Sequence, residues 1–207
     1  MNEAAIFVVE DDDAGREALL AWLTARGCRA QGFPSALDFL ANANLQARGC
    51  VISDFRMPGM NGTQLQAELN ERQSVLPVII VSGYADVPVA VQAMQQGAVT
   101  LLEKPYQNDE LWDAISDALT RNFYAHQQIE KADSVRRRLA ELSQTQRKVM
   151  QLLIAGRPNK AVANQLNLGL RTVERHRQQI LKAMQVDSLP ELATLLATVE
   201  QTPASNC

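Results

Sequence analysis

Short apolar runs alternate with stretches of helical spacing through the first half of the chain. In those stretches apolar residues recur every three or four positions, which is typical of amphipathic helices. This alternation predicts an α/β doubly wound fold, a five-stranded parallel sheet with helices on both faces. The predicted strands are Ala5–Val9, Arg29–Gln31 (the weakest), Cys50–Ser53, Val78–Val81 and Val99–Leu102, and the predicted helices are Ala14–Arg26, Ser35–Asn44, Gly62–Arg72 and Asp86–Gln96.

The second half is predicted to be helical throughout. Tyr106–Ala155 contains neither Gly nor Pro, so one long helix or two helices end to end fit the pattern. Ser143 and Gln146 have the spacing of a capping box, and a new helix is expected to start there. After it, Gly and Pro residues separate three further helices, Asn159–Leu166, Leu170–Met184 and about Pro190–Glu200.

Charge is divided unevenly between the two halves. Residues 1–120 hold 7 Lys and Arg against 16 Asp and Glu, whereas residues 121–207 hold 13 against 7. Two domains with different partners are therefore expected, the basic one a candidate for binding nucleic acid, with Arg136–Arg138 adding charge to a linker. No apolar stretch approaches the roughly 20 residues of a membrane span, and no export signal is evident, which predicts a cytoplasmic protein without a membrane partner.

Polar residues follow four of the predicted strands. Carboxyl ends of parallel strands share one edge of an open sheet, and chemistry gathers there. Converging carboxylates need a cation, and oxygen ligands favour a hard divalent ion such as Mg²⁺ (or Mn²⁺). A lysine and a serine would suit a tetrahedral anion beside a carboxylate nucleophile. The residues are Glu10 and Asp11 after the first strand, Asp54 after the third, Ser82 after the fourth and Lys104 after the fifth.

This set of positions resembles the receiver domain of bacterial response regulators, over about residues 4–120. The matching stretches are Val8–Asp11, Ser53–Gly62, Val81–Gly83 and Glu103–Pro105. The resemblance implies a flavodoxin-like fold in which Asp54 is the phosphoacceptor.

The resemblance also implies the roles of the surrounding groups. Glu10, Asp11, Asp54 and the backbone carbonyl of Arg56 would hold Mg²⁺. Ser82 and Lys104 would contact the phosphoryl group, and the Lys104–Pro105 peptide bond would be cis.

Two features bear on switching and lifetime. Leu101 occupies the place where many receivers have an aromatic residue that moves with the serine. A coupled movement is therefore in doubt, although Leu101 could still change rotamer. By the resemblance, Arg56 and Tyr84 flank the phosphoryl pocket and would tune access of water.

The helices Asn159–Leu166 and Leu170–Met184 have the spacing of a helix-turn-helix. One face of the second helix is apolar and the other polar, which suits a major groove but also an ordinary solvated helix. The polar face carries Arg171, Glu174, Arg175, Gln178 and Lys182.

Three stretches here resemble the four-helix DNA-binding domain of the LuxR and NarL type, over about residues 139–200. They are Leu142–Arg147, Gly156–Lys160 and Arg171–Arg177, and with the receiver they make the whole chain similar to FixJ-like response regulators. By this resemblance the last helix pairs subunits on DNA. Base contacts fall on Glu174, Arg175 and Gln178, and phosphate contacts on Lys160, Arg171, Thr172 and His176.

The resulting expectation is a receiver at 1–120, a helical linker at 121–138, a DNA-binding domain at 139–200 and a tail at 201–207. A histidine kinase would phosphorylate Asp54, which promotes a homodimer through Val87–Gln96 and Leu101 and binding to double-stranded promoter DNA. RNA polymerase is a further candidate partner. The chain is not expected to be an enzyme beyond its own phosphorylation and dephosphorylation.

Two alternatives stay open. One is a constitutive DNA-binding regulator whose receiver is only a dimerisation scaffold. The other is an aspartyl-phosphate hydrolase, which is disfavoured because such enzymes place Asp-x-Asp after the first strand and the chain has no evident cap insert.

Overall fold

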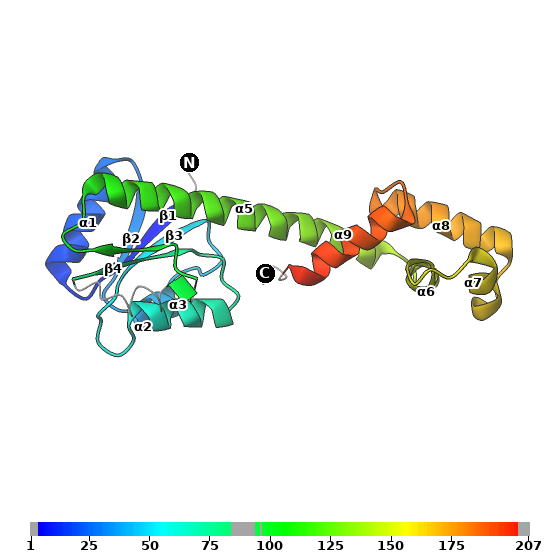
Figure 1. Ribbon diagram of the computed structural model, residues 1–207, viewed down its shortest axis with the longest axis horizontal. Coiled ribbons are helices and arrows are strands. Elements are labelled where there is room, and N and C mark those ends of the chain that lie inside the picture. The colour runs from blue at the N-terminus through cyan, green and yellow to red at the C-terminus, as the bar shows by residue number, and fades with distance from the viewer. Residues whose placement is uncertain (1–3, 84–93, 96, 203–207) are drawn as a thin grey trace. The chain divides into compact units, whose positions relative to one another are not determined.

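The computed structural model describes residues 4–83, 94–95 and 97–202. Its contacts divide the chain into two compact units, Met1–Gln127 and Gln128–Cys207. Helix α5 (Asn108–Glu141) begins in the first unit and ends in the second (Figure 1). Among the described residues, no helix combines the length and the apolar character that crossing a bilayer requires.

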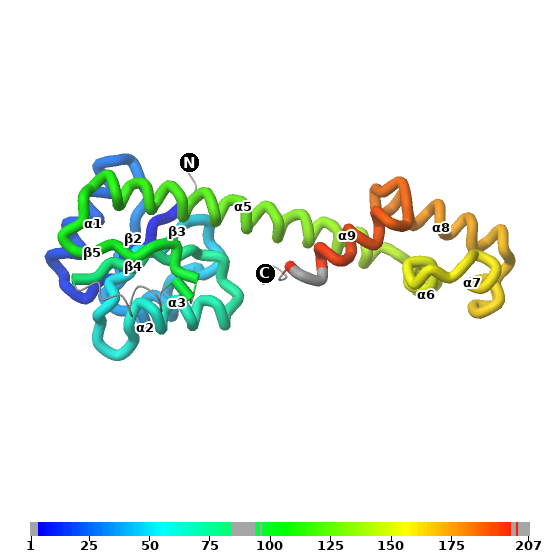
Figure 2. The backbone as a smooth tube through the Cα atoms, viewed as in Figure 1, coloured from blue at the N-terminus to red at the C-terminus, as the bar shows by residue number. Residues whose placement is uncertain are grey.

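The first unit is a parallel five-stranded sheet with helices on both faces, as predicted. The strands lie in the order β2-β1-β3-β4-β5. Figure 2 follows the backbone of this unit, with α5 on one side of the strands and α2 (Ala36–Asn42) and α3 (Gly62–Glu71) on the other. Their bounds are Ala5–Val9 for β1, Arg29–Phe33 for β2, Gly49–Asp54 for β3, Val78–Ser82 for β4 and Thr100–Glu103 for β5. All five predicted strands are present, each within a few residues of its predicted bounds.

Alternate residues of the strands point to two separate apolar cores. Phe7 and Val9 of β1 pack with α2 and α3, whereas Ile6 and Val8 pack with α1 (Asp13–Ala25) and α5. Every residue of β3 and β4 is buried, as central parallel strands require. The predicted helix at 86–96 falls almost wholly outside the described residues.

Asn122 ties α5 to the first unit. Its side chain is 2% exposed, accepts from the Gly49 backbone N–H at 2.9 Å and donates to the Val75 carbonyl at 2.8 Å. The His126 ring lies 3.2 Å from the Ala47 carbonyl. Three backbone groups near the ends of strands thus have partners on one helix, which keeps them from being buried unpaired.

The second unit contains the end of α5 and four further helices. They are α6 (Gln144–Ile154), α7 (Asn159–Leu166), α8 (Leu170–Met184) and α9 (Leu189–Gln201). The predicted capping box is present, because Ser143 accepts from the Gln146 N–H and the Gln146 side chain accepts from the Ser143 N–H. α5 therefore ends just before Ser143, and two helices follow end to end there.

Residues 121–138, predicted as a helical linker, are continuous helix within α5. Ala132 and Val135 from this stretch are buried in the core of the second unit together with Leu142 and Val149. The part of α5 after Gln127 is consequently a component of the second unit, whereas the residues before it belong to the first.

Candidate functional site

Three carboxylates meet at the carboxyl edge of the sheet. β1 pairs with β3 so that Val9 lies opposite Ser53, which places the next residues, Glu10 and Asp54, side by side. Ligand oxygens of Glu10, Asp11 and Asp54 all lie within 4.8 Å of one another. Glu10 and Asp54 are buried and Asp11 is exposed. A cluster of like charge with one open side is suited to receiving a cation from solvent.

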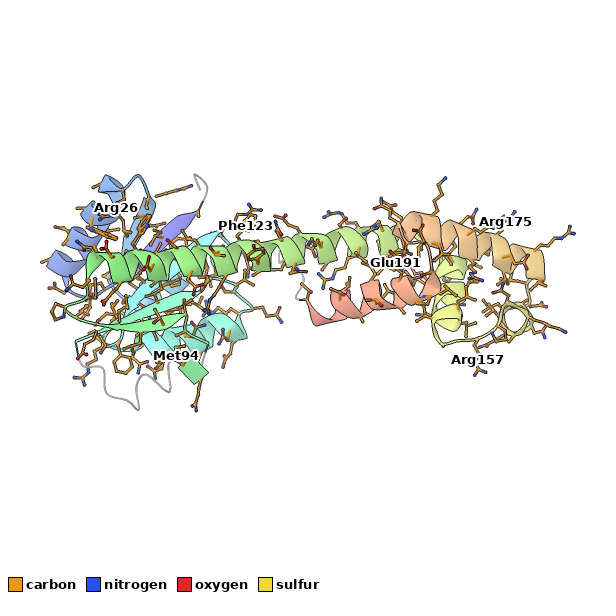
Figure 3. All side chains as sticks on the ribbon, turned by 45° about the horizontal axis from the view of Figure 1, so that its top comes forward. Arg26, Met94, Phe123, Arg157, Arg175 and Glu191 are labelled. Carbon is orange, nitrogen blue, oxygen red and sulfur yellow. The ribbon has the colours of Figure 1, made fainter. Side chains whose placement is uncertain are left out.

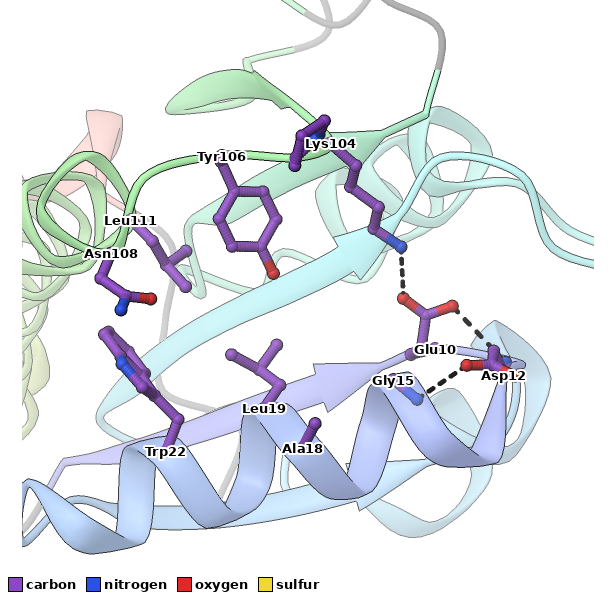
Figure 4. Close-up of a pocket in the computed structure, with 11 residues that line it drawn as sticks. Glu10, Asp12, Gly15, Ala18, Leu19, Trp22, Lys104, Tyr106, Asn108 and Leu111 are labelled. Carbon is purple, nitrogen blue, oxygen red and sulfur yellow. Dashed lines mark hydrogen bonds and ion pairs between the residues drawn. The ribbon is translucent and has the colours of Figure 1, made fainter.

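Lys104 supplies a positive charge to this cluster. From the end of β5 its amine reaches Glu10 Oε2 at 2.6 Å (Figure 4). The same amine lies 3.0 Å from Asp54 Oδ1. Burial lowers the pKa of this amine, but the hydrogen bonds and charges of Glu10 and Asp54 outweigh burial, so that the pKa is raised. The amine therefore stays protonated at neutral pH. One ammonium against three carboxylates leaves two negative charges, which a divalent ion would neutralise.

The Lys104–Pro105 peptide bond is cis, as the resemblance implied. A cavity of about 550 Å³ opens beside Lys104 and Glu10, with α1 on one side and the start of α5 on the other (Figure 4). The Lys104–Glu10 ion pair lies at one end of the cavity, and Asn108 adds a polar group at the other (Figure 4). The lining includes Leu19, Trp22, Tyr106 and Leu111.

Ser82 and Leu101 occupy neighbouring strands close to the cluster. Ser82 is the last residue of β4 and is 1% exposed, and its carbonyl accepts from the Lys104 N–H at 2.7 Å. Leu101 lies opposite Ile80 and packs, half-buried, against the core on the α2 and α3 side. The backbone hydrogen bond places Ser82 beside Lys104. The side chain of Leu101 is partly exposed.

The remaining receiver predictions concern the loops. Arg56 is exposed, two residues beyond Asp54. Tyr84 and the predicted dimer face at Val87–Gln96 lie outside the described residues, except for 94 and 95 within that range. Asp12 caps α1 by accepting from the Gly15 N–H at 2.7 Å.

Two supporting residues were not singled out from the sequence. Arg16 donates to the Glu10 carbonyl at 2.8 Å and so fixes the backbone that carries a metal-ligand candidate. A Cβ on Gly62 would lie 2.7 Å from the Asp54 carbonyl, which only glycine avoids. Gly62 was visible as the end of a matching motif, whereas nothing local in the sequence pointed to Arg16.

Helices α7 and α8 form the predicted helix-turn-helix. Asn167 ends α7 in the left-handed conformation with φ 53°, and Gly169 precedes α8 without a side-chain cap. Val173, Ile180 and Met184 bury one face of α8 in the core of the second unit. The turn geometry and the buried face leave the other side of α8 to solvent.

The candidate DNA contacts lie on that outer side. Glu174, Arg175 and Gln178 are all exposed on α8, and Figure 3 shows Arg175 on this helix. Thr172 and His176 are only partly exposed, and the buried Nδ1 of His176 has no hydrogen-bond partner among the described residues. Lys160 on α7 and Arg171 on α8 are exposed.

Comparison with known proteins agrees with both halves of this geometry. Residues 6–116 match the response regulator receiver domain, and residues 140–196 match the bacterial regulatory proteins of the luxR family. The transcriptional regulatory protein FixJ of Azorhizobium caulinodans is 37% identical over 201 residues, which is 97% of this chain and 95% of FixJ. The chain belongs to the NarL/FixJ family of response regulators.

Other relatives of this response regulator also match over nearly the whole length. The response regulator protein TmoT of Ectopseudomonas mendocina is 37% identical over 92% of this chain and 87% of its own. The structure of the response regulator StyR has a TM-score of 0.78 at 34% identity, covering 94% of this chain and 98% of StyR. Full-length FixJ from B. japonicum has a TM-score of 0.57 at 37% identity, covering 97% and 98%. Both the receiver and the DNA-binding domain are thus shared with transcriptional regulators of two-component systems.

Proposed function

We propose that Asp54 is the phosphoacceptor that controls DNA binding by this response regulator. The observation that carries the proposal is the meeting of Asp54, Glu10 and Asp11 within 4.8 Å, with the Lys104 amine on Asp54 at 3.0 Å. A carboxylate beside both a cation site and a fixed ammonium can attack a phosphoryl group whose charge those cations screen.

The cation that suits this donor set is Mg²⁺, or Mn²⁺, because all its side-chain ligands are carboxylate oxygens. Glu10, Asp11, Asp54 and the backbone carbonyl of Arg56 would hold it, and when bound it would neutralise charge on the phosphoryl oxygens. Lys104 would hold one of those oxygens, and Ser82 would donate a hydrogen bond to another. Arg56 and Tyr84 would limit access of water, and Leu101 would transmit a small change at the surface.

The step itself transfers one phosphoryl group. An Asp54 carboxylate oxygen forms a bond to phosphorus while the bond from phosphorus to the donor breaks. The donor would be a phosphohistidine of a sensor histidine kinase, whose imidazole nitrogen keeps the electron pair of the broken bond, or acetyl phosphate, whose acetate leaves with that pair. The chemistry ends with self-dephosphorylation by water, without turnover of other phosphate esters.

Phosphorylation would favour a homodimer that places two α8 helices on promoter DNA in the cytoplasm. Glu174, Arg175 and Gln178 would read bases, since these side chain types pair with cytosine, guanine and adenine edges. Lys160, Arg171, Thr172 and His176 would contact phosphates. RNA polymerase is a further proposed partner.

The domain organisation proposed for this function is a receiver at 1–120, a connecting helix at 121–138, a DNA-binding domain at 139–200 and a tail at 201–207. The contact boundary after Gln127 falls inside the connecting helix. That position supports a helix shared by the two units.

The test compares Asp54→Asn with Asp113→Asn, an exposed carboxylate on α5 that serves as the matched control. With Mg²⁺ and acetyl phosphate, intact-protein mass spectrometry should show one added phosphoryl group on the wild type and on Asp113→Asn. Asp54→Asn should gain none, and its mass and DNA footprint should stay those of the untreated protein.

Two results would redirect the proposal. If the wild type gains no mass yet footprints DNA, the receiver is a scaffold on a constitutive regulator. If it instead turns over a phosphomonoester continuously, the site belongs to a hydrolase.

A further inference from the structure

The three arginines of the basic run Arg136–Arg138 on α5 have three different environments. Arg137 is exposed and makes no hydrogen bond or ion pair with the part of the chain that the structure describes. Arg136 and Arg138 are partly buried and reach other helices of the second unit. The run is therefore more than a solvated charge on a linker.

Arg138 reaches the carboxyl end of α8. Its Nη1 donates to the Met184 carbonyl at 2.5 Å and to Gln185 Oε1 at 3.1 Å. Met184 is the last residue of α8, and Gln185 is its C-cap in the left-handed conformation with φ 58°. The last carbonyls of a helix lack partners within the helix and carry partial negative charge, so a guanidinium there is stabilising.

Arg136 repeats this arrangement at α9. It donates to the Val199 carbonyl at 2.9 Å and to the Thr202 carbonyl, and Asp133 holds it at 2.8 Å. Two consecutive helices of the second unit thus end on arginines of α5. The α5 backbone that carries them is itself anchored, because Ala132 and Val135 are buried in the same core.

We propose that Arg138 is a positioning residue for DNA recognition. By holding the carboxyl end of α8 against α5, it restricts the tilt of the helix that presents Glu174, Arg175 and Gln178. This rests on the proposed role of α8 in reading DNA. Arg138 contacts no base in this account, and its charge acts on the helix end rather than on a phosphate.

The experiment compares Arg138→Ala with Arg137→Ala, which removes the same charge from the adjacent residue. The probe is a duplex selected from a random-sequence pool by the wild type, with full-length protein treated with Mg²⁺ and acetyl phosphate. Affinity is measured over a series of salt concentrations. Arg138→Ala should bind roughly three- to tenfold more weakly, the size expected for losing one hydrogen bond of ordinary net strength, and Arg137→Ala should bind like the wild type.

Salt dependence separates positioning from a direct phosphate contact. Loss of a phosphate contact lowers the slope of log affinity against log salt by about 1, whereas loss of positioning leaves the slope unchanged. Hydrogen exchange gives a second readout, because the backbone N–H groups of Gln185 and Val186 bond to the last turn of α8. These amides should exchange faster in Arg138→Ala and at the wild-type rate in Arg137→Ala.

Arg138→Lys keeps the charge and one donor for the Met184 carbonyl but loses the guanidinium hydrogen bond to Gln185 Oε1. It should bind with intermediate affinity and exchange at an intermediate rate, and it decides the question if Arg138→Ala does not fold. Wild-type affinity and exchange in Arg138→Lys would then overturn the proposal, as would a changed salt slope or equal affinities of the folded Arg138→Ala and Arg137→Ala.

Arg175→Ala distinguishes failure of this inference from failure of the role proposed for α8. If Arg175→Ala weakens binding but Arg138→Ala does not, only the positioning role is wrong. If Arg175→Ala has no effect either, α8 does not read the DNA and both proposals fail.

Discussion

The exposed carboxylate of the acidic cluster offers a test in which the sign of a stability change depends on metal. Asp11 lies within 4.8 Å of the ligand oxygens of Glu10 and Asp54. Unlike those two, it makes no ion pair with Lys104 among the described contacts. Asp11→Asn therefore removes repulsion without removing a salt bridge, and it keeps nearly the same volume.

The magnitude follows from Coulomb's law. Two unit charges 4.8 Å apart repel by about 0.9 kcal/mol in bulk water and by about 1.7 kcal/mol at an effective dielectric constant of about 40. Asp11 takes part in two such pairs, and both salt screening and the positive charge of Lys104, which is paired with Glu10 and Asp54, reduce the net repulsion. Without divalent ions, Asp11→Asn should thus raise the free energy of unfolding by roughly 1–2 kcal/mol.

Divalent ions should reverse the order of the two proteins. An ion that binds only the folded state stabilises it by about 1.4 kcal/mol at ten times its dissociation constant, and by more at higher concentration. The wild type should gain this stabilisation from Mg²⁺, whereas Asp11→Asn has lost a ligand and should gain little. Urea denaturation followed by circular dichroism, with EDTA and then with excess MgCl₂, measures both effects.

Glu17→Gln provides the matched control, because Glu17 is exposed on α1 outside the cluster. It removes one negative charge by the same carboxylate-to-amide change. The electrostatic reasoning is refuted if Asp11→Asn and Glu17→Gln have the same stability in EDTA. The metal assignment is refuted if Asp11→Asn gains as much from Mg²⁺ as the wild type does.

Three further predictions concern the receiver fold. Asn122→Ala should lower the free energy of unfolding by about 2–4 kcal/mol, because the Gly49 N–H and the Val75 carbonyl lose their buried partner. Urea denaturation measures this change, and an effect below about 1 kcal/mol would contradict the prediction. Gly49→Ala should prevent folding or shift β3, because the added Cβ would lie 1.9 Å from the Ala5 carbonyl oxygen; a native circular dichroism spectrum and unchanged melting temperature would count against this close approach. Burial raises the pKa of the Cys50 thiol to about 12. Iodoacetamide at mildly alkaline pH should therefore modify Cys50 only after unfolding. Peptide mass mapping with and without urea measures this difference.

Local patterns in the sequence predicted the strands and most of the helices that the structure describes. The wholly apolar run Val78–Val81 predicted a strand buried on both faces, and β4 is fully buried. Ser143 and Gln146 predicted a helix start that the capping box confirms. Such signals succeed because each depends on residues a few positions apart, whose preferences act before any distant contact forms.

The acidic site required the order of the strands, which no local pattern contains. Glu10 meets Asp54 because β1 pairs with β3, and Lys104 reaches both from β5, 94 residues beyond Glu10. The resemblance identified these residues from their motifs, but the pairing of the strands sets the distances between them and therefore the charge balance of the site. Long-range pairing is set by which apolar faces bury one another, so it emerges only when the whole unit is packed.

The basic run on α5 shows the same division most clearly. Its composition was visible from the sequence and suggested a charged linker between domains. Only the fold brings Arg138 to the end of a helix 46 residues away and Arg136 to the Val199 carbonyl 63 residues away. The sequence by itself determined that these residues are cations on a helix. The tertiary structure decided what they bind, because the carbonyls at a helix end become partners for a side chain only once packing has placed that end beside it.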